Sequence, residues 1–211
     1  GFRRPIESDP EKNLLMVPRK QRAMVRKAER RGLVSDIDGD VDRFYPIYAT
    51  SVRNLGTPVF GIAYFRALKR IFGDACEITT IFDAKGQAVS SVMSFIFRDE
   101  ILPYYGGGTA AARGLAANDF MYWEVMRRAC ERGFKWFDFG RSKIGTGAYN
   151  FKKNWGFKPT PIAYSYWLRR REHLPEVNPL NPKYRNFIAV WKRLPLPLAN
   201  LLGPRIARYL G

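Results

Sequence analysis

The period of the apolar residues changes near residue 73, and this change limits the fold more than any other feature. Before it, apolar side chains recur every three to four residues, as in amphipathic helices, over 41–54 and 61–72. After it, the segments 76–83, 88–98 and 101–106 are rich in β-branched and aromatic residues and are separated by short turns. The sequence therefore predicts helices followed by an antiparallel meander of three strands.

The first predicted helix, over 19–31, is strongly basic and ends at Gly32, which suits the left-handed position after a helix. Arg22, Arg26 and Arg30 are four residues apart, so they share one face and repel each other. Either an anionic partner or close packing of its apolar residues is therefore needed to stabilise this helix. In the next helix, Pro46 is expected to mark a start or a kink.

The second half alternates strands and helices. We expect a small-residue loop over 109–117, a helix over 118–132 capped by Asn118, a strand over 135–139 and a short helix over 148–155. A last strand is predicted over Pro161–Arg169. The strand after the long helix should run parallel to the strand before it, because such crossovers are right-handed. The whole is an α+β fold with a central mixed β-sheet flanked by helices, an order similar to the acyltransferase architecture called the GNAT fold.

Length and charge suggest how the chain is organised. Its 211 residues suit one domain, which we place at 19–171, with an N-terminal segment at 1–18 and a basic, Pro-rich tail at 172–211. The formal net charge is +17. Residues 34–124 are nearly neutral, with eight basic and eleven acidic side chains, whereas residues 125–160 carry nine basic and two acidic ones. Such a field attracts anionic substrates, nucleic acid or an anionic membrane face, although a soluble protein with solvated basic faces would look the same.

Two counts exclude whole chemistries. The chain has two cysteines, Cys76 and Cys130, and one histidine, His173. These are too few for a Cys/His zinc site or a disulfide scaffold, so we expect no metal and no bound cofactor. His173 lies in a charged run and is expected to be solvated rather than catalytic. Reduced cysteines, with no secretory signal, fit a cytoplasmic protein.

A glycine-rich loop over 137–147 is the first candidate site. A strand ends, the chain passes Gly140, Gly145 and Gly147, and a helix begins. Ligands of α/β sheets collect beyond the carboxyl ends of strands, and helix starts attract anions. Arg141 and Lys143 add full charges, so the loop could seat a phosphate or a carboxylate. A tight turn that uses its glycines only for backbone geometry is the alternative.

Two further segments could shape a site. Gly106, Gly107 and Gly108 follow a strand and precede Arg113, a poor match to the pyrophosphate loop of enzymes that use acyl-CoA, and a flexible loop is equally compatible. Arg53 and Asn54 stand at a helix end and could line a pocket or simply end the helix.

These segments together resemble a known family. The stretch from Phe137-Asp138-Phe139-Gly140 to Asn154-Trp155-Gly156-Phe157 is similar to the closing motif of the FemAB family, and the basic stretch 18–28 resembles the segment that opens its second GNAT-like domain. With 53–58 and 104–108, the chain resembles the FemAB-like proteins associated with exosortase (PEP-CTERM) systems, over roughly residues 14–194.

The resemblance implies an acyltransferase that moves an acyl or aminoacyl group to an amine of a cell-envelope precursor, of peptidoglycan or exopolysaccharide type. It implies aminoacyl-tRNA or acyl-CoA as donor, and tRNA or a nucleotide- or lipid-linked precursor as anionic partner. It also implies an upstream GNAT-like domain. The family's transfer-assisting lysine falls on Lys152, and we expect Asp138 to orient Arg141 or to accept a proton. The expected substrate-binding residues are Arg53, Asn54, Tyr104, Tyr105, Arg113, Arg141, Ser142, Lys143 and Tyr149.

The tail adds a membrane hypothesis. Residues 183–211 interleave apolar and basic side chains and contain no acid, which suits peripheral contact with an anionic inner-membrane surface, a seat against another domain, or packing on the chain's own sheet. Two other functions stay open: an ordinary acyl-CoA-dependent N-acyltransferase, and a non-catalytic module that binds polyanions or membranes.

Overall fold

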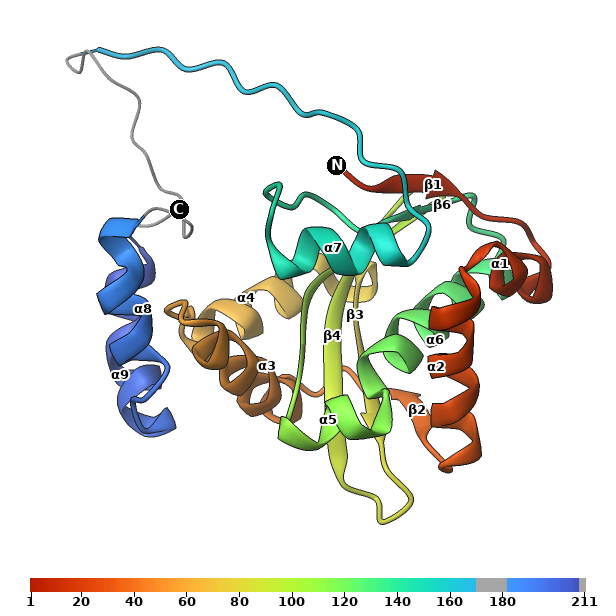
Figure 1. The fold of residues 1–211 in the computed structure, drawn as a ribbon, viewed down its shortest axis with the longest axis horizontal. Coiled ribbons are helices and arrows are strands. Elements are labelled where there is room, and N and C mark those ends of the chain that lie inside the picture. Colours follow the sequence, from red (N-terminus) through yellow and green to blue (C-terminus); the bar gives the residue numbers. More distant parts are fainter. Residues whose placement is uncertain (170–181, 209–211) are drawn as a thin grey trace.

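A computed structural model describes residues 1–169 and 182–208, and within them one mixed sheet of six strands runs through the molecule (Figure 1). The strand order is β1-β6-β5-β4-β3-β2. The strands are β1 (Arg3–Pro5), β2 (Val34–Ile37), β3 (Cys76–Phe82), β4 (Ala88–Phe97), β5 (Glu100–Gly108) and β6 (Trp136–Asp138). Neighbours pair antiparallel except β5 and β6, which are parallel. The α+β class, the mixed sheet and the meander are confirmed.

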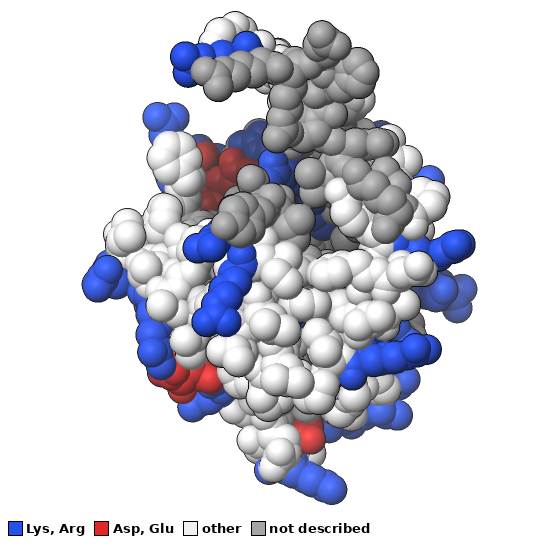
Figure 2. Space-filling model, turned by 90° about the vertical axis from the view of Figure 1, so that its left-hand side faces the viewer, with Lys and Arg blue, Asp and Glu red and all other residues white. Residues whose placement is uncertain are grey.

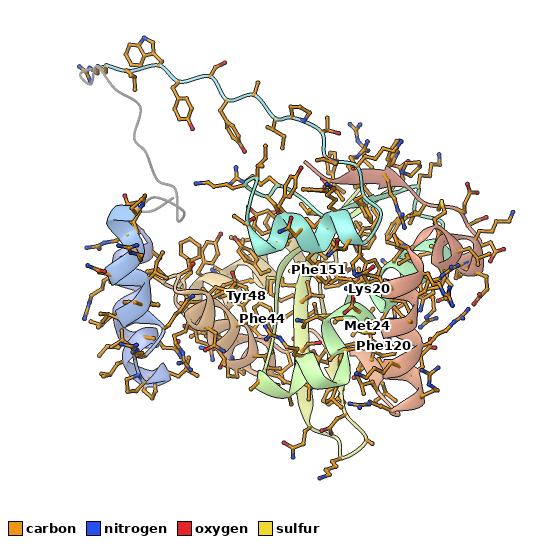
Figure 3. All side chains as sticks on the ribbon, viewed as in Figure 1. Lys20, Met24, Phe44, Tyr48, Phe120 and Phe151 are labelled. Carbon is orange, nitrogen blue, oxygen red and sulfur yellow. The ribbon has the colours of Figure 1, made fainter. Side chains whose placement is uncertain are left out.

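Helices cover both faces of the sheet. They are α1 (Pro10–Met16), α2 (Arg19–Arg30), α3 (Val41–Leu55), α4 (Ile62–Phe72), α5 (Ala110–Leu115), α6 (Ala117–Glu131), α7 (Gly147–Asn154), α8 (Arg185–Trp191) and α9 (Leu196–Ala207). Phe44 and Tyr48 of α3 belong to the core on one side, and Met24 of α2 and Phe120 of α6 to the core on the other (Figure 3). Burial of these two apolar layers is the main force that holds the helices to the sheet.

Local signals explain where the helices begin and end. The Asp40 side chain accepts hydrogen bonds from the backbone N–H groups of Asp42 and Arg43, so α3 begins at Val41 as expected. Pro46 stands inside α3. Gly32 follows α2 with φ of +71°, the left-handed conformation that its sequence predicts.

The parallel strands diverge. Glu100 pairs with Trp136 and Ile101 with Phe137, after which β5 continues to Gly108 while β6 ends at Asp138. The crossover between them contains α6. The predicted parallel pair, open at its carboxyl ends, is confirmed.

Three predicted elements are wrong. The expected loop 109–117 contains α5, because a run of alanines favours helix. Asn118 does not cap the next helix: α6 begins at Ala117, after Ala116 in the left-handed conformation. Pro161–Arg169 is not a strand. Thr160 exchanges backbone hydrogen bonds with Gly1, but the residues after it are mostly exposed, and no strand lies beside them in the described structure.

The first forty residues supply both edges of the sheet. β1 pairs with β6 at one edge, and β2 pairs with β3 at the other. Phe2, Leu14 and Val17 are buried in the core. Neither edge strand was predicted, because each has only three or four residues and no alternation of apolar side chains.

The end of the chain packs against α3 and the segment after it. Arg53 donates to the backbone oxygen of Lys192 at 2.9 Å, and the Trp191 indole N–H donates to the oxygen of Thr57 at 3.1 Å. Helices α8 and α9 therefore lie at the α3 end of the molecule (Figure 1). His173 falls outside the described residues.

Candidate active site

A cavity of about 710 Å³ lies over β1 and β6, between Tyr104 of β5 and the segment 160–164. A bulge in β5 helps to shape it: Met93 of β4 faces Tyr105 and Ser94 faces Pro103, which leaves Tyr104 as the extra residue. Bulges re-aim side chains and are frequent beside active sites. The lining includes Arg3, Tyr104, Trp136, Asp138, Arg141 and Tyr164.

Asp138 ends β6 at the cavity wall. Its Oδ1 accepts a hydrogen bond from the backbone N–H of Gly140 at 2.6 Å, which fixes the turn that follows the strand. Burial raises the pKa of this carboxyl, while the hydrogen bond from Gly140 opposes the shift. The structure therefore shows the backbone-satisfying role of Asp138 and places the same carboxyl against the cavity.

Lys152 does not line the cavity itself, but it forms a hydrogen bond with a residue that does. Its ammonium donates to the backbone oxygen of Arg141 at 3.1 Å and lies 5.8 Å from the centre of the Phe2 ring. Burial lowers the pKa of Lys152 to about 8, with Asp138 acting in the opposite direction. A lysine in this environment changes its charge near neutral pH, unlike an ordinary surface lysine.

The loop after β6 brings further polar groups to the same place. Arg141 donates to the Tyr164 hydroxyl at 3.1 Å, so it connects the loop to the segment that follows α7. The Ser142 hydroxyl is buried and has no hydrogen-bond partner in the described structure. The oxygen of Lys143 accepts from the Thr146 hydroxyl, which in turn caps α7. Ser142 and Lys143 belong to this loop and Lys152 adjoins it, but none of the three is among the residues that line the cavity.

Four other predicted residues lie elsewhere, and Tyr149 contacts the edge of this region. Tyr105 packs in the aromatic core beside α3 and α4 and shares a hydrogen bond with the Tyr64 hydroxyl. Arg53 holds the chain end, as described above, and Asn54 is exposed next to it. Arg113 is exposed on α5. Tyr149 makes an edge contact with Phe2, with ring centres 5.2 Å apart.

The three glycines at 106–108 form no loop. They are the last residues of β5 and pair with Ser90, Ser91 and Val92 of β4. A Cβ at Gly107 would lie 2.6 Å from the Cβ of Ser51 on α3, so the glycine is needed for close packing. The predictions that this segment is a pyrophosphate loop or a flexible loop are therefore wrong.

Among the side chains of the lining named above, Arg3, Trp136 and Tyr164 were not predicted. The guanidinium of Arg3 stacks on the Trp136 ring at 3.7 Å and pairs with Glu100, and Tyr164 is the partner of Arg141. Arg3 carries no sequence signal, because its role depends on β1 pairing with β6. Tyr164 lies in the predicted strand Pro161–Arg169, where Ile162, Tyr164 and Tyr166 alternate as in a strand although the structure has none there.

Within the described residues, no cluster of His, Cys, Asp and Glu could hold a metal ion. Both cysteines there are free and buried. No helix in the same residues combines the length and apolar character needed to cross a bilayer.

The comparisons with known proteins agree with this architecture. The family described as acetyltransferase (GNAT) domain matches residues 19–153. The solved structure titled "Crystal structure of FemX" superposes with a TM-score of 0.68 at 16% identity, covering 74% of this chain and 58% of that one. A C-terminal domain of a putative lysylphosphatidylglycerol synthetase from Agrobacterium fabrum gives 0.50 at 14% identity, covering 66% and 51%. A search of curated protein sequences finds no significant match. The chain thus spans little more than half the length of these structures, and the similarity concerns the fold.

Proposed function

Because this chain belongs to the acetyltransferase (GNAT) domain family, we propose that it is an acyltransferase that moves an acyl or aminoacyl group to an amine of a cell-envelope precursor. The observation that carries the proposal is the cavity over β1 and β6, with the bulged Tyr104, a half-buried carboxylate and a guanidinium on its walls. The FemAB resemblance supplies the acceptor class, of peptidoglycan or exopolysaccharide type.

The transfer joins the acceptor amine to the carbonyl carbon of an ester or thioester and expels the donor's alcohol or thiol. We assign Asp138 to take the proton that the attacking amine must lose, since it faces the cavity and burial raises its pKa. Lys152, protonated, would stabilise the oxyanion of the tetrahedral intermediate by reaching past the Arg141 backbone. Arg141 would hold a phosphate or carboxylate of donor or acceptor.

Two donor classes fit the proposal, acyl-CoA and aminoacyl-tRNA, because both present an activated carbonyl on a polyanionic carrier. The strongly positive segment 125–160, which contains the cavity loop, would attract either. The unpartnered Ser142 hydroxyl beside Arg141 adds a group that a bound ligand could satisfy.

The experiment offers labelled acetyl-CoA and labelled aminoacyl-tRNA in turn, with an amine-bearing peptidoglycan stem peptide as acceptor, and measures labelled product. Lys152→Ala should lower kcat by about 10²- to 10³-fold, the usual loss of one oxyanion donor. Lys153→Ala is the matched control, because Lys153 is the next residue of α7 and is exposed. Equal losses in the two variants would contradict the role of Lys152, and no product with either donor would contradict the proposed activity.

One observation favours a second function, a non-catalytic polyanion-binding module. Arg19, Arg22, Arg26 and Arg30 line a hollow of about 290 Å³ on α2, and none of them forms an ion pair within the described residues. In that case binding would depend steeply on salt, and Lys152→Ala would leave it unchanged.

A further inference from the structure

Helix α9 buries its small residues and exposes several of its leucines. Its buried residues are the small ones, Ala199, Gly203 and Ala207, which recur every four residues and so form one face. Its exposed residues include Leu198, Leu201 and Leu202, which are 47%, 58% and 39% exposed. A helix held only by its own domain would bury its leucines and expose its small residues.

The small residues let α9 approach the body of the protein very closely. A Cβ on Gly203 would lie 2.8 Å from the backbone oxygen of Val59. The approach fixes which side of the helix faces inward, and with it the outward direction of the leucines. Helix α8 is fixed likewise by the buried Trp191, while its Phe187 and Val190 stay exposed.

Within residues 182–208, every charged side chain near the exposed leucines is basic. Residues 182–208 contain no Asp or Glu, and exposed basic residues accompany the leucines, among them Lys192, Arg193 and Arg205. Figure 2 views the molecule from the side on which α8 and α9 lie and shows a broad uncharged surface with blue side chains around it and a few red ones near its margins. Exposed apolar side chains bordered by basic ones are typical of helices that lie in a membrane interface.

We propose that the outward face of α8 and α9, with Phe187, Val190, Leu198, Leu201 and Leu202, docks on an anionic lipid surface. The occupant is a bilayer rather than a protein, because the segment 182–208, which contains basic residues and no acid, complements lipid phosphates and the leucines can enter the acyl region without a shaped pocket. This inference is independent of the proposed reaction, because neither helix contributes a residue to the cavity lining among the described residues.

The test measures co-sedimentation of the whole chain with phosphatidylcholine vesicles, with and without phosphatidylglycerol. We expect binding only to the anionic vesicles, and loss of binding at high salt. Leu198→Ser/Leu201→Ser should lower the partition coefficient at least tenfold, since both side chains would lose their burial in lipid. Leu15→Ser/Val34→Ser is the matched control, because Leu15 and Val34 are 63% and 59% exposed on α1 and β2, far from α9.

Two charge-reversal variants distinguish this face from the basic surface of α2. Arg193→Glu/Arg205→Glu should weaken binding to anionic vesicles by at least tenfold, whereas Arg19→Glu/Arg26→Glu on α2 should weaken it far less. All four variants change exposed side chains, and their thermal unfolding curves should match that of the unmodified chain. Equal binding to neutral vesicles, a stronger effect of the α2 pair, or no effect of the leucine pair would overturn the proposal. If the leucine variant instead separates a dimer into monomers without changing vesicle binding, the face is an interface between copies and the proposal is wrong.

Discussion

Lys152 is the residue whose surroundings differ most from those of an ordinary surface side chain. It is half-buried beside Phe2, its ammonium has a backbone carbonyl as partner, and burial lowers its pKa to about 8. Its neighbour Lys153 is exposed. Position in α7 thus places one of two adjacent lysines beside the Phe2 ring and leaves the other exposed.

If Lys152 acts in its protonated form, kcat/KM for transfer should fall as the pH rises through about 8. Lys152→Arg should keep some activity and lose this fall, because a guanidinium stays charged. The pH profile of both proteins with the same donor checks the prediction. A rate that instead rises through this pH would make Lys152 a proton acceptor.

The same shift predicts a stability effect. The folded pKa of about 8 lies below the ordinary 10.5, so between these values the unfolded chain binds more protons and stability rises with pH. Lys152→Met should therefore raise Tm at pH 7 by a few degrees, and the gain should vanish above about pH 10.5. Thermal unfolding of both proteins across this range is the measurement, and a gain independent of pH would point to packing alone.

Gly107 limits how closely β5 and α3 can pack. Gly107→Ala should destabilise the protein by about 1–3 kcal/mol, because the new Cβ would meet the Cβ of Ser51 at 2.6 Å. Gly114→Ala on α5 is the control, since a Cβ there meets nothing within 4 Å. Denaturant unfolding gives both values, and equal stability of the two variants would contradict the close contact.

At the scale of elements, α8 and α9 form a unit attached to α3 through a small number of contacts. The Trp191 side chain is buried, stacks on Phe187 with ring centres 5.4 Å apart and donates to Thr57. Elements held by few contacts open locally before the whole protein unfolds.

Trp191→Ala should release this unit. We expect hydrogen exchange of the α8 and α9 amides to accelerate at least 100-fold, because a buried aromatic side chain contributes several kcal/mol, while the β3 and β4 amides keep their protection. Phe187→Ala, which removes a ring that is 40% exposed, should have a much smaller effect. Equal acceleration in the sheet would show that the helices unfold only with the rest of the protein.

The elements also show how far sequence reasoning reaches. The meander, α3, α4 and α6 were predicted from the period of their apolar residues. Helix α2 was predicted from its stop at Gly32, and α7 from its place after the glycine-rich loop. Strands β1 and β2 were not, since their pairing is decided by distant residues such as Asp138 and Phe82. For the same reason the local loop sufficed to single out Asp138 and Arg141, which line the cavity, whereas Arg3, brought to the lining by β1, was not predicted.

At the scale of the whole molecule, the net charge of +17 is unevenly compensated. Several arginines are paired with acids, including Arg43, Arg66, Arg127 and Arg132. The arginines along α2 form no such pairs in the described structure. Unpaired charges dominate the attraction to polyanions, because paired ones are already neutralised.

Replacing Arg19, Arg22, Arg26 and Arg30 by Ser should therefore lower the salt concentration that elutes the protein from heparin. Each lost contact reduces the slope of log K against log salt by roughly one. Replacing Lys12, Lys85, Lys153 and Lys158 by Ser removes the same charge from exposed positions outside α2 and should have a smaller effect. Equal elution of the two variants would mean that net charge, not the α2 row, governs binding.

The placement of both edge strands in the first forty residues has a consequence for synthesis on the ribosome. The meander can form as soon as it emerges, because its contacts are local, but β2 must wait for β3, and β1 must wait for β6, some 130 residues later. Of the six strands of this sheet, β1 thus emerges first and is paired among the last. Two arginines and a proline make up β1, a composition that discourages pairing with other chains during this delay.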